Sequence, residues 1–186
     1  NGSSWSSAPS LTRSPAQYGI AGAGLQTAAL AVGGFDTANY TTSSESYNGS
    51  AWTAITAHPI ANRAAAGCGT QTASLAFGGL DGPVAPKATC ELWNGTNWTE
   101  VNDLNGAIYG TSGGGTQTDA IRAGGVTDGA ANPSATVETW NGTSWTETTD
   151  INTSRGYNAA AAANSTAALI AGGTTNSGPS LSALTE

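Results

Sequence analysis

Carboxylates recur along this chain at a spacing that does not suit a catalytic pair. Glu45, Glu91 and Glu138 lie one sequence repeat apart, and Glu186 continues the series. General acid–base catalysis needs two groups that meet at one place and have different pKa values. One carboxylate in every repeat instead predicts a structural role, because each repeat needs its own copy.

The other residues that could carry chemistry are sparse. His58 is the only histidine, so we predict neither a three-histidine zinc site nor a catalytic triad, and its place before Pro59 predicts a loop residue. Asp36, Asp81 and Asp128 follow glycine pairs in loops that should share one rim. Their oxygens could bind Ca²⁺, but without a D-x-D-x-D-G run, turn capping is the better interpretation. We therefore expect no catalytic residue, no cofactor and no metal.

The two cysteines are predicted to stay free thiols. Cys68 falls on the first predicted strand of its repeat and Cys90 on the third, with another strand between them. Neighbouring strands lie about 4.8 Å apart, so about 9.6 Å should separate these two. A disulfide needs Cα atoms within about 7 Å, so we expect none.

The elements that must hold these residues repeat four times. An Asn-Gly pair, followed three residues after the Gly by Trp, recurs in steps of 47, 46 and 47 residues, and a Gly-Gly pair recurs at a matching period. Such a period is typical of propeller blades or helical solenoid units. Counted from this marker, the repeats of this single domain or four-blade segment span about 1–47, 48–93, 94–140 and 141–186. The Asn-Gly pairs begin at Asn1, Asn48, Asn94 and Asn141, and the Gly pairs at Gly33, Gly78, Gly124 and Gly172.

One repeat contains four short apolar segments, at residues 64–69, 73–77, 89–93 and 97–101. Gly pairs, Asn-Gly and two prolines in a loop separate them, so no helix-length stripe survives and a helical solenoid is disfavoured. Four antiparallel strands per repeat make a propeller blade. The predicted fold class is therefore all-β, a β-propeller of four four-stranded blades.

The order of features within each repeat resembles a Kelch repeat. Arg precedes a small apolar strand, a second strand ends in Gly-Gly, a third carries Glu and an aromatic residue, and Trp opens the last. Arg63 and Arg155 occupy the place of the Kelch arginine, whereas the third repeat has Asn105 in that region. The resemblance implies a Kelch-like propeller, a family with diverse functions. The Asn-Gly-, Thr- and Ala-rich composition also resembles repeats of phage structural and bacterial surface proteins.

The Asn-Gly marker predicts a hairpin between the last two strands of each blade. A two-residue type I′ turn at Asn94 places Trp93 opposite Thr96 and Glu91 opposite Trp98, all on one face. We expect these Trp residues to pack between blades, with a sugar-stacking platform as the alternative. The residues predicted to mark the repeat structurally are Trp5, Trp52, Trp98, Trp145, Glu45, Glu91, Glu138 and Glu186.

The two ends of the sequence are predicted to complete one blade together. Residues 3–7 match a fourth strand without a third, and residues 181–186 match a third strand without a fourth. Pairing them would place Glu186 against Trp5, and it would remove exposed edges that invite aggregation. The pairing can form within the chain, or between copies in a larger assembly.

Composition limits the classes of partner that we expect for this chain. The net charge is −7 with only five Lys and Arg, so we expect no nucleic-acid binding. No apolar run reaches the roughly 20 residues of a membrane helix, so no membrane span is expected. The sequence has no Met, which suggests a processed protein or a segment of a longer one. Candidate glycosylation sites outside the Asn-Gly turns are Asn39, Asn97, Asn152 and Asn164.

These observations favour a non-enzymatic structural or attachment module, outside a cell, on its surface or on a virion. Self-association or a larger structural assembly is the expected partner. The alternative is a glycan-binding, lectin-like propeller that uses exposed Trp or Tyr between blades, with carbohydrate as its partner. An enzyme on a propeller scaffold ranks third.

Overall fold

The computed structural model describes residues 4–13, 19–128, 132–175 and 183–186. Within them every named element is a β-strand, and each sheet is an antiparallel meander in which strands adjacent in sequence are neighbours. The strands are β1 (Ala21–Leu25), β2 (Ala28–Val32), β3 (Ser44–Tyr47) and β4 (Trp52–Ala54); β5 (Ala66–Thr70), β6 (Ala73–Phe77), β7 (Cys90–Trp93) and β8 (Trp98–Glu100); β9 (Ser112–Gly115), β10 (Ala120–Ala123), β11 (Val137–Trp140) and β12 (Trp145–Glu147); and β13 (Ala159–Asn164) and β14 (Ala167–Ala171).

The fourth sheet has a short third segment at the end of the chain. The backbone N–H of Ile170 donates to the Glu186 carbonyl at 2.7 Å, and the Glu186 N–H donates back at 2.8 Å. Thr185 forms a β-bridge with Ala171. The fourth blade therefore contains β13, β14 and residues 184–186 in the part of the chain that is described.

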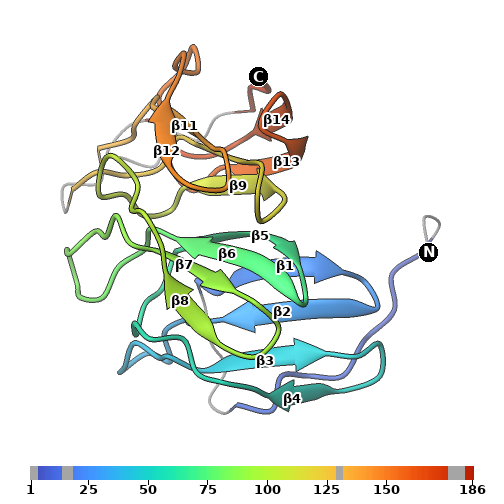
Figure 1. Cartoon of the computed structure of the whole chain (residues 1–186). Coiled ribbons are helices and arrows are strands. Elements are labelled where there is room, and N and C mark those ends of the chain that lie inside the picture. Colours follow the sequence, from blue (N-terminus) through green and yellow to red (C-terminus); the bar gives the residue numbers. More distant parts are fainter. Residues whose placement is uncertain (1–3, 14–18, 129–131, 176–182) are drawn as a thin grey trace.

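The four sheets are blades arranged in an arc (Figure 1). Their innermost strands β1, β5, β9 and β13 contact one another in that order, whereas β1 and β13 do not pack together as the neighbouring pairs do. The predicted all-β propeller is thus confirmed. The strands of the second blade also lie within two residues of their predicted bounds, and the alanine-rich run at 159–163 is a strand.

Small residues at the inner strands let the blades approach closely. A Cβ added to Gly67 would lie 2.9 Å from the backbone oxygen of Gly22 on the preceding blade. A Cβ added to Gly114 would lie 2.7 Å from the Cβ of Ala162 on the following blade. Side chains larger than those present would push neighbouring blades apart at these positions, which accounts for the glycines there.

The core lies between blades. Leu75, Phe77 and Cys90 of the second blade pack against Trp140 and Trp145 of the third. One face of each of these blades covers the preceding blade and the other is covered by the following blade. The chain therefore stabilises itself mainly through burial of apolar surface along the series.

The hairpin register differs from the prediction. Trp93 pairs with Trp98, and Glu91 pairs with Glu100, so each pair is two residues out of the predicted register. The side-chain oxygen of Asn94 accepts hydrogen bonds from the N–H groups of Thr96 and Asn97, both at 2.9 Å, so the loop spans four residues. Because the shift is by two residues, Glu and Trp still share a face as predicted.

The predicted closure between the chain ends does not occur within the chain. The part of residues 3–7 that is described belongs to no strand, and Trp5 is fully exposed, at 103%. Glu186 is instead bound to Arg155 and to the Asn152 N–H. Glu186 therefore has a cation as its partner in place of Trp5. Pairing between copies stays a prediction.

Candidate functional site

In each blade a basic side chain lies against one of the four periodic Glu residues. All four Glu residues lie at the corresponding position of the third strand. Glu45, Glu91 and Glu138 are at most 2% exposed. The pairs are Arg13 Nε–Glu45 at 3.1 Å, His58 Nε2–Glu91 at 3.2 Å, Arg122–Glu138, and Arg155 Nη2–Glu186 at 2.6 Å.

The first and fourth blades have an arginine that makes the same set of contacts. Arg155 donates from Nη1 to the carbonyl oxygens of Gly172 and Leu184, at 3.1 and 2.9 Å, while Nη2 binds Glu186. Arg13 makes the equivalent set of contacts in the first blade. The guanidinium thus ties the loop that enters a blade to the second and third strands, through charge-assisted hydrogen bonds to backbone carbonyls and an ion pair with the Glu.

In the third blade two residues together bind the periodic Glu138. Asn105 binds Glu138 through its backbone N–H at 2.8 Å and its amide Nδ2 at 2.6 Å. Arg122 on β10 supplies the positive charge, with Nε 3.1 Å from the same carboxylate. Asn105 departs from the repeat pattern and carries no charge, so Arg122 on a neighbouring strand takes the place of the arginine.

The second blade uses the single histidine. His58 lies in a loop, as predicted, and its side chain is buried there, at 1% exposure. Its Nδ1 lies 2.9 Å from the Ile60 carbonyl, and its ring packs edge-on against Trp98 with 4.8 Å between centroids. Packing against an aromatic ring and a buried carboxylate makes it part of the inter-blade core.

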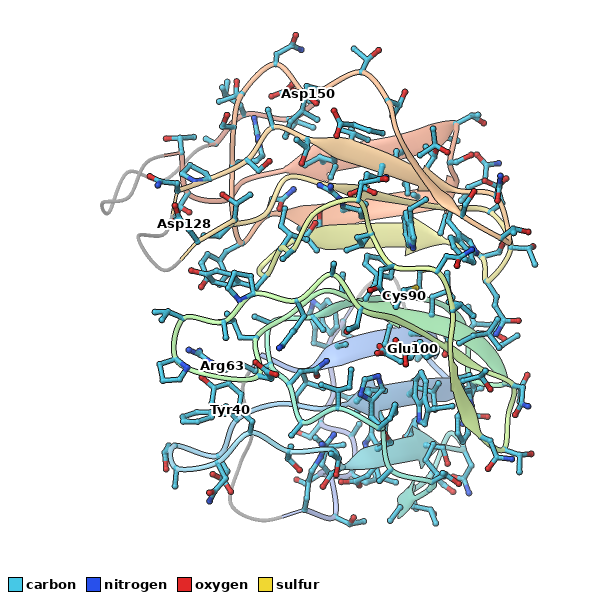
Figure 2. The ribbon with its side chains drawn as sticks, turned by 60° about the vertical axis from the view of Figure 1, so that its left-hand side comes forward. Tyr40, Arg63, Cys90, Glu100, Asp128 and Asp150 are labelled. Carbon is cyan, nitrogen blue, oxygen red and sulfur yellow. The ribbon has the colours of Figure 1, made fainter. Side chains whose placement is uncertain are left out.

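The predicted alignment of Arg63 with Arg155 is wrong by one residue. The Arg155 carbonyl accepts from Gly125 N–H, and the Asn62 carbonyl accepts the corresponding bond from Gly34 N–H. Arg63 instead places its guanidinium 5.3 Å from the Phe35 ring centre and 5.8 Å from that of Tyr40, as Figure 2 shows for Tyr40. Stacking of this kind fixes a cation at the mouth of the inner strands.

The tryptophans of the hairpins serve packing in most blades. Trp93 and Trp140 are 2% exposed, Trp145 is 5% exposed, and Trp52 and Trp98 are half-buried. The indole N–H groups of Trp93 and Trp140 donate to backbone carbonyls at 2.9 Å. A ring that is buried and bonded in this way offers no free face to a sugar.

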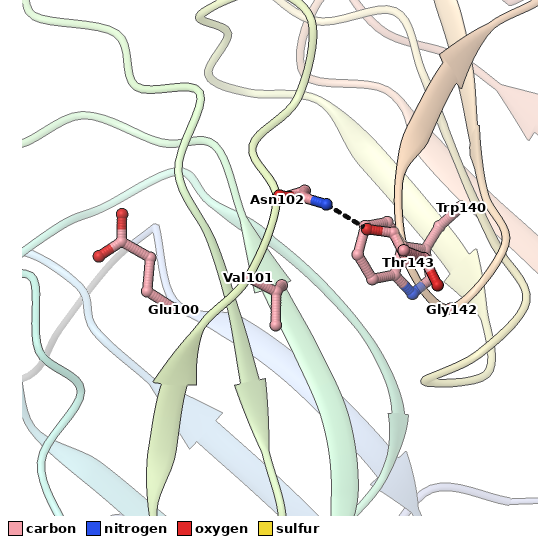
Figure 3. A pocket seen from close by; sticks show the side chains of 6 residues that line it. All are labelled: Glu100, Val101, Asn102, Trp140, Gly142 and Thr143. Carbon is pink, nitrogen blue, oxygen red and sulfur yellow. Dashed lines mark hydrogen bonds between the residues drawn. The ribbon is translucent and has the colours of Figure 1, made fainter.

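A perimeter pocket lies between the hairpins of the second and third blades (Figure 3). Glu100, Asn102, Trp140 and Thr143 are among the residues that line it, and the Asn102 amide donates to the Thr143 carbonyl at 2.7 Å. Its aromatic residue, Trp140, is buried. Among the described residues that line this pocket there is therefore no exposed ring of the kind that the lectin-like alternative requires.

A second pocket lies at the mouth of the inner strands, which we name the axial pocket. It has a volume of about 380 Å³ and takes residues from corresponding positions of all four blades. Its lining is Gly19, Ile20, Arg63, Ala64, Ala65, Gly110, Thr111, Tyr157 and Asn158.

A backbone ladder forms the floor of the axial pocket. Ala64 N–H donates to Gly19, Gly110 N–H to Ala64, and Tyr157 N–H to Gly110, at 2.7, 2.8 and 2.7 Å. The four residues have left-handed φ angles of 68, 56, 55 and 53° for Gly19, Ala64, Gly110 and Tyr157. Glycine adopts this conformation freely, whereas a residue with a side chain is strained there.

The strained position carries the most exposed ring of the pocket. Tyr157 is 54% exposed and contacts Tyr109 edge-on at 6.0 Å. Beside it, the buried Asn158 Oδ1 has no hydrogen-bond partner among the described residues, while Nδ2 donates to the Ala123 carbonyl at 3.2 Å. Burial, assisted by the neighbouring Tyr157, raises the pKa of the Tyr109 phenol. The exposed ring of Tyr157 and the side chain of Arg63 thus line one pocket.

Little in the sequence points to this site. Gly19 and Gly110 are two glycines among 26, and the equivalent Ala64 and Tyr157 have no residue type that signals a left-handed conformation. The usable signal is the spacing, because these four positions follow the repeat period.

The loop aspartates cap turns or pair locally. Asp36 Oδ1 accepts from the N–H groups of Ala38 and Asn39, which lower its pKa, and Asp81 pairs with Lys87 at 2.6 Å. Among the described residues no group of three or more His, Cys, Asp and Glu could hold a metal ion.

The structure gives the burial of the two cysteines and of the four candidate glycosylation sites. Cys68 on β5 and Cys90 on β7 are free and buried, with β6 between them as the strand order predicted. Asn39, Asn97 and Asn152 are exposed and Asn164 is half-buried. Glycosylation at these sites stays a prediction.

Comparison with known proteins identifies the fold and no family. No family model matches the chain, and no curated protein matches it. Among solved structures, that of YjhT, itself a β-propeller, superposes with a TM-score of 0.72 at 14% identity. The match covers 90% of this chain and 64% of YjhT, so the chain spans less than two thirds of that protein. At this identity the likeness establishes the propeller fold alone.

No helix in the described residues is long and apolar enough to span a membrane.

Proposed function

We propose that this chain is a non-enzymatic structural and attachment module, built of Kelch-like repeats and displayed outside a cell, on its surface or on a virion. The observation that carries the proposal is the use of the periodic carboxylates. Each lies against a basic side chain within its blade, an arginine beside Glu45, Glu138 and Glu186 and the only histidine beside Glu91. The groups best suited to acid–base chemistry therefore serve to hold the strands and entering loops of the blades in place.

Carbohydrate at the axial pocket is the ligand that best fits the attachment role. Sugars bind through an aromatic face together with directed polar groups, and a preformed concave site orients them. The exposed ring of Tyr157 and the guanidinium of Arg63 supply these features. Tyr157 also adopts a left-handed φ where two other blades have glycine. A strained position that keeps a large exposed ring suggests a functional ring.

A glycan array tests this proposal with two matched variants. Tyr157→Gly removes the ring and restores the residue type of Gly19 and Gly110. Ala64→Gly makes the equivalent backbone change and leaves the ring in place. We expect binding by the wild type and by Ala64→Gly, and loss of binding by Tyr157→Gly at equal folded fraction.

The non-enzymatic part is tested on the same glycans. Their masses, measured after incubation with the chain, are expected to remain unchanged. A product that forms with the wild type and disappears with Tyr157→Gly would show catalysis at the axial pocket and contradict the proposal.

A further inference from the structure

The fourth blade leaves uncovered a face that the next blade covers elsewhere. Leu30, Leu75 and Leu169 occupy the same register position, opposite the third residue of the inner strand. Leu30 and Leu75 are 3% and 1% exposed, whereas Leu169 is 53% exposed. Ala159 and Ala161 on β13 are exposed as well. The side chains on this face are apolar and small, so another blade can pack closely against it.

The first blade has the complementary surface uncovered. In the third blade, Trp145 packs against Phe77 of the preceding blade with 4.9 Å between ring centres, and it is 5% exposed. The equivalent Trp52 of the first blade is half-buried, as is Trp98 of the second, so the comparison of the inner strands is the one that distinguishes the faces. Gly22 is exposed on the same face, although the equivalent Gly67 lies against the preceding blade. This face is therefore of the type that receives a preceding blade.

A third pair of unused surfaces lies at the outer edge. Residues 4–8 are exposed, and they precede Thr12, whose N–H binds Glu45 at 2.8 Å. Asn105 and Asn152 make the same contact in later blades, and each lies seven residues after its Trp, as Thr12 lies seven after Trp5. Residues 5–7 are thus in phase to be the outermost strand of a blade that precedes the first.

The edge that such a strand would join is available in the fourth blade. Backbone groups of Leu184 and Glu186 form hydrogen bonds with residues 170 and 172, at β14. The N–H and C=O groups of Thr185 therefore point away from β14, to the open edge. In the first three blades the carbonyl at the equivalent position accepts a hydrogen bond, at 3.0 Å, from the residue three places after the fourth-strand Trp. The donor three places after Trp5 is Ala8.

We propose that copies of this chain associate head to tail. The first blade of one copy packs on the Leu169 face of the fourth blade of another. Residues Trp5–Ala8 of the first copy add as the fourth strand beside Thr185 of the second. One blade-to-blade geometry brings both unpartnered faces and both unpartnered edges together, which favours a second copy as the occupant. The interface is heterologous, so it closes into a ring or continues as a chain of copies.

Sedimentation of the full chain over a concentration series tests the proposal. We expect a mass of at least twice 18.3 kDa, falling toward the monomer on dilution. Leu169→Asp places a charge in the apolar contact, and Ala8→Pro removes the N–H that pairs with Thr185. Both variants are expected to sediment as monomers at concentrations where the wild type is associated.

Val84→Asp is the matched control, because Val84 is 63% exposed in the loop between β6 and β7, away from both faces. It is expected to associate like the wild type. A wild type that stays at 18.3 kDa throughout, or association that survives both Leu169→Asp and Ala8→Pro, would overturn the proposal. The outcome is independent of the attachment proposal, since glycan binding is read separately on the same variants.

Discussion

Replacing Glu138 by glutamine should destabilise the protein more than any comparable change at the surface. Glu138 is fully buried, and its carboxylate binds Asn105 twice and Arg122 through two nitrogens. Glu138→Gln keeps the shape and removes the charge, which leaves the Arg122 guanidinium buried without compensation. Breaking a buried ion pair in this way costs about 3–5 kcal/mol, a large part of the roughly 5–15 kcal/mol that holds a domain folded.

Urea unfolding followed by the fluorescence of the buried tryptophans measures this cost. Glu147→Gln is the matched control, since Glu147 is the exposed cross-strand partner of Glu138 on β12; its effect should stay within about 0.5 kcal/mol. The double change Glu138→Leu with Arg122→Met should recover most of the loss, because well-packed apolar residues replace a buried pair at little cost. A Glu138→Gln variant within about 1 kcal/mol of the wild type would refute the structural role of the pair.

Three further outcomes are expected. Burial raises the pKa of the thiols of Cys68 and Cys90 to about 12, so a disulfide reagent at pH 8 should modify them only after unfolding, and rapid modification of the native chain would contradict their burial. Burial alone would raise the pKa of Glu186, but the Asn152 N–H and the Arg155 charge outweigh it and lower the pKa; its contribution to stability is therefore present above the ordinary value of 4.5 and lost as the pH falls through the folded value. The difference in urea midpoint between wild type and Glu186→Gln should shrink on acidification, and a difference independent of pH would argue against the pair. Ala64→Gly should leave the free energy of unfolding within about 1 kcal/mol, because relief of the left-handed strain offsets the added chain entropy; a larger loss would mean that the methyl group packs.

Strand positions could be predicted because their signals are local. Alternating apolar residues, Gly pairs and Asn-Gly turns mark the start and end of β6 and β7 within the repeat. The hairpin register was missed because the Asn94 side chain takes two backbone hydrogen bonds and lengthens the loop to four residues. A dipeptide signal alone does not specify which residues close the turn.

The site was harder to predict because its residues do not align. The Glu residues are periodic, but the basic side chains beside them are Arg13, His58, Arg122 and Arg155, which occupy three different places in the blade. Strand pairing brings Arg122 to Glu138, and the path of the loop that precedes each first strand brings the others to their Glu. The axial ladder is hidden for a similar reason, since a left-handed residue such as Tyr157 follows from the backbone path between blades and carries no mark in its residue type.

The most direct test of the proposed role is glycan binding by Tyr157→Gly beside Ala64→Gly. Both variants place glycine at equivalent rungs of the same ladder, so they differ chiefly in the exposed ring at the axial pocket. The attachment role at this pocket predicts that Tyr157→Gly loses the array signal while Ala64→Gly keeps it. Equal binding by the two variants would contradict it, and would move the ligand away from the axial pocket.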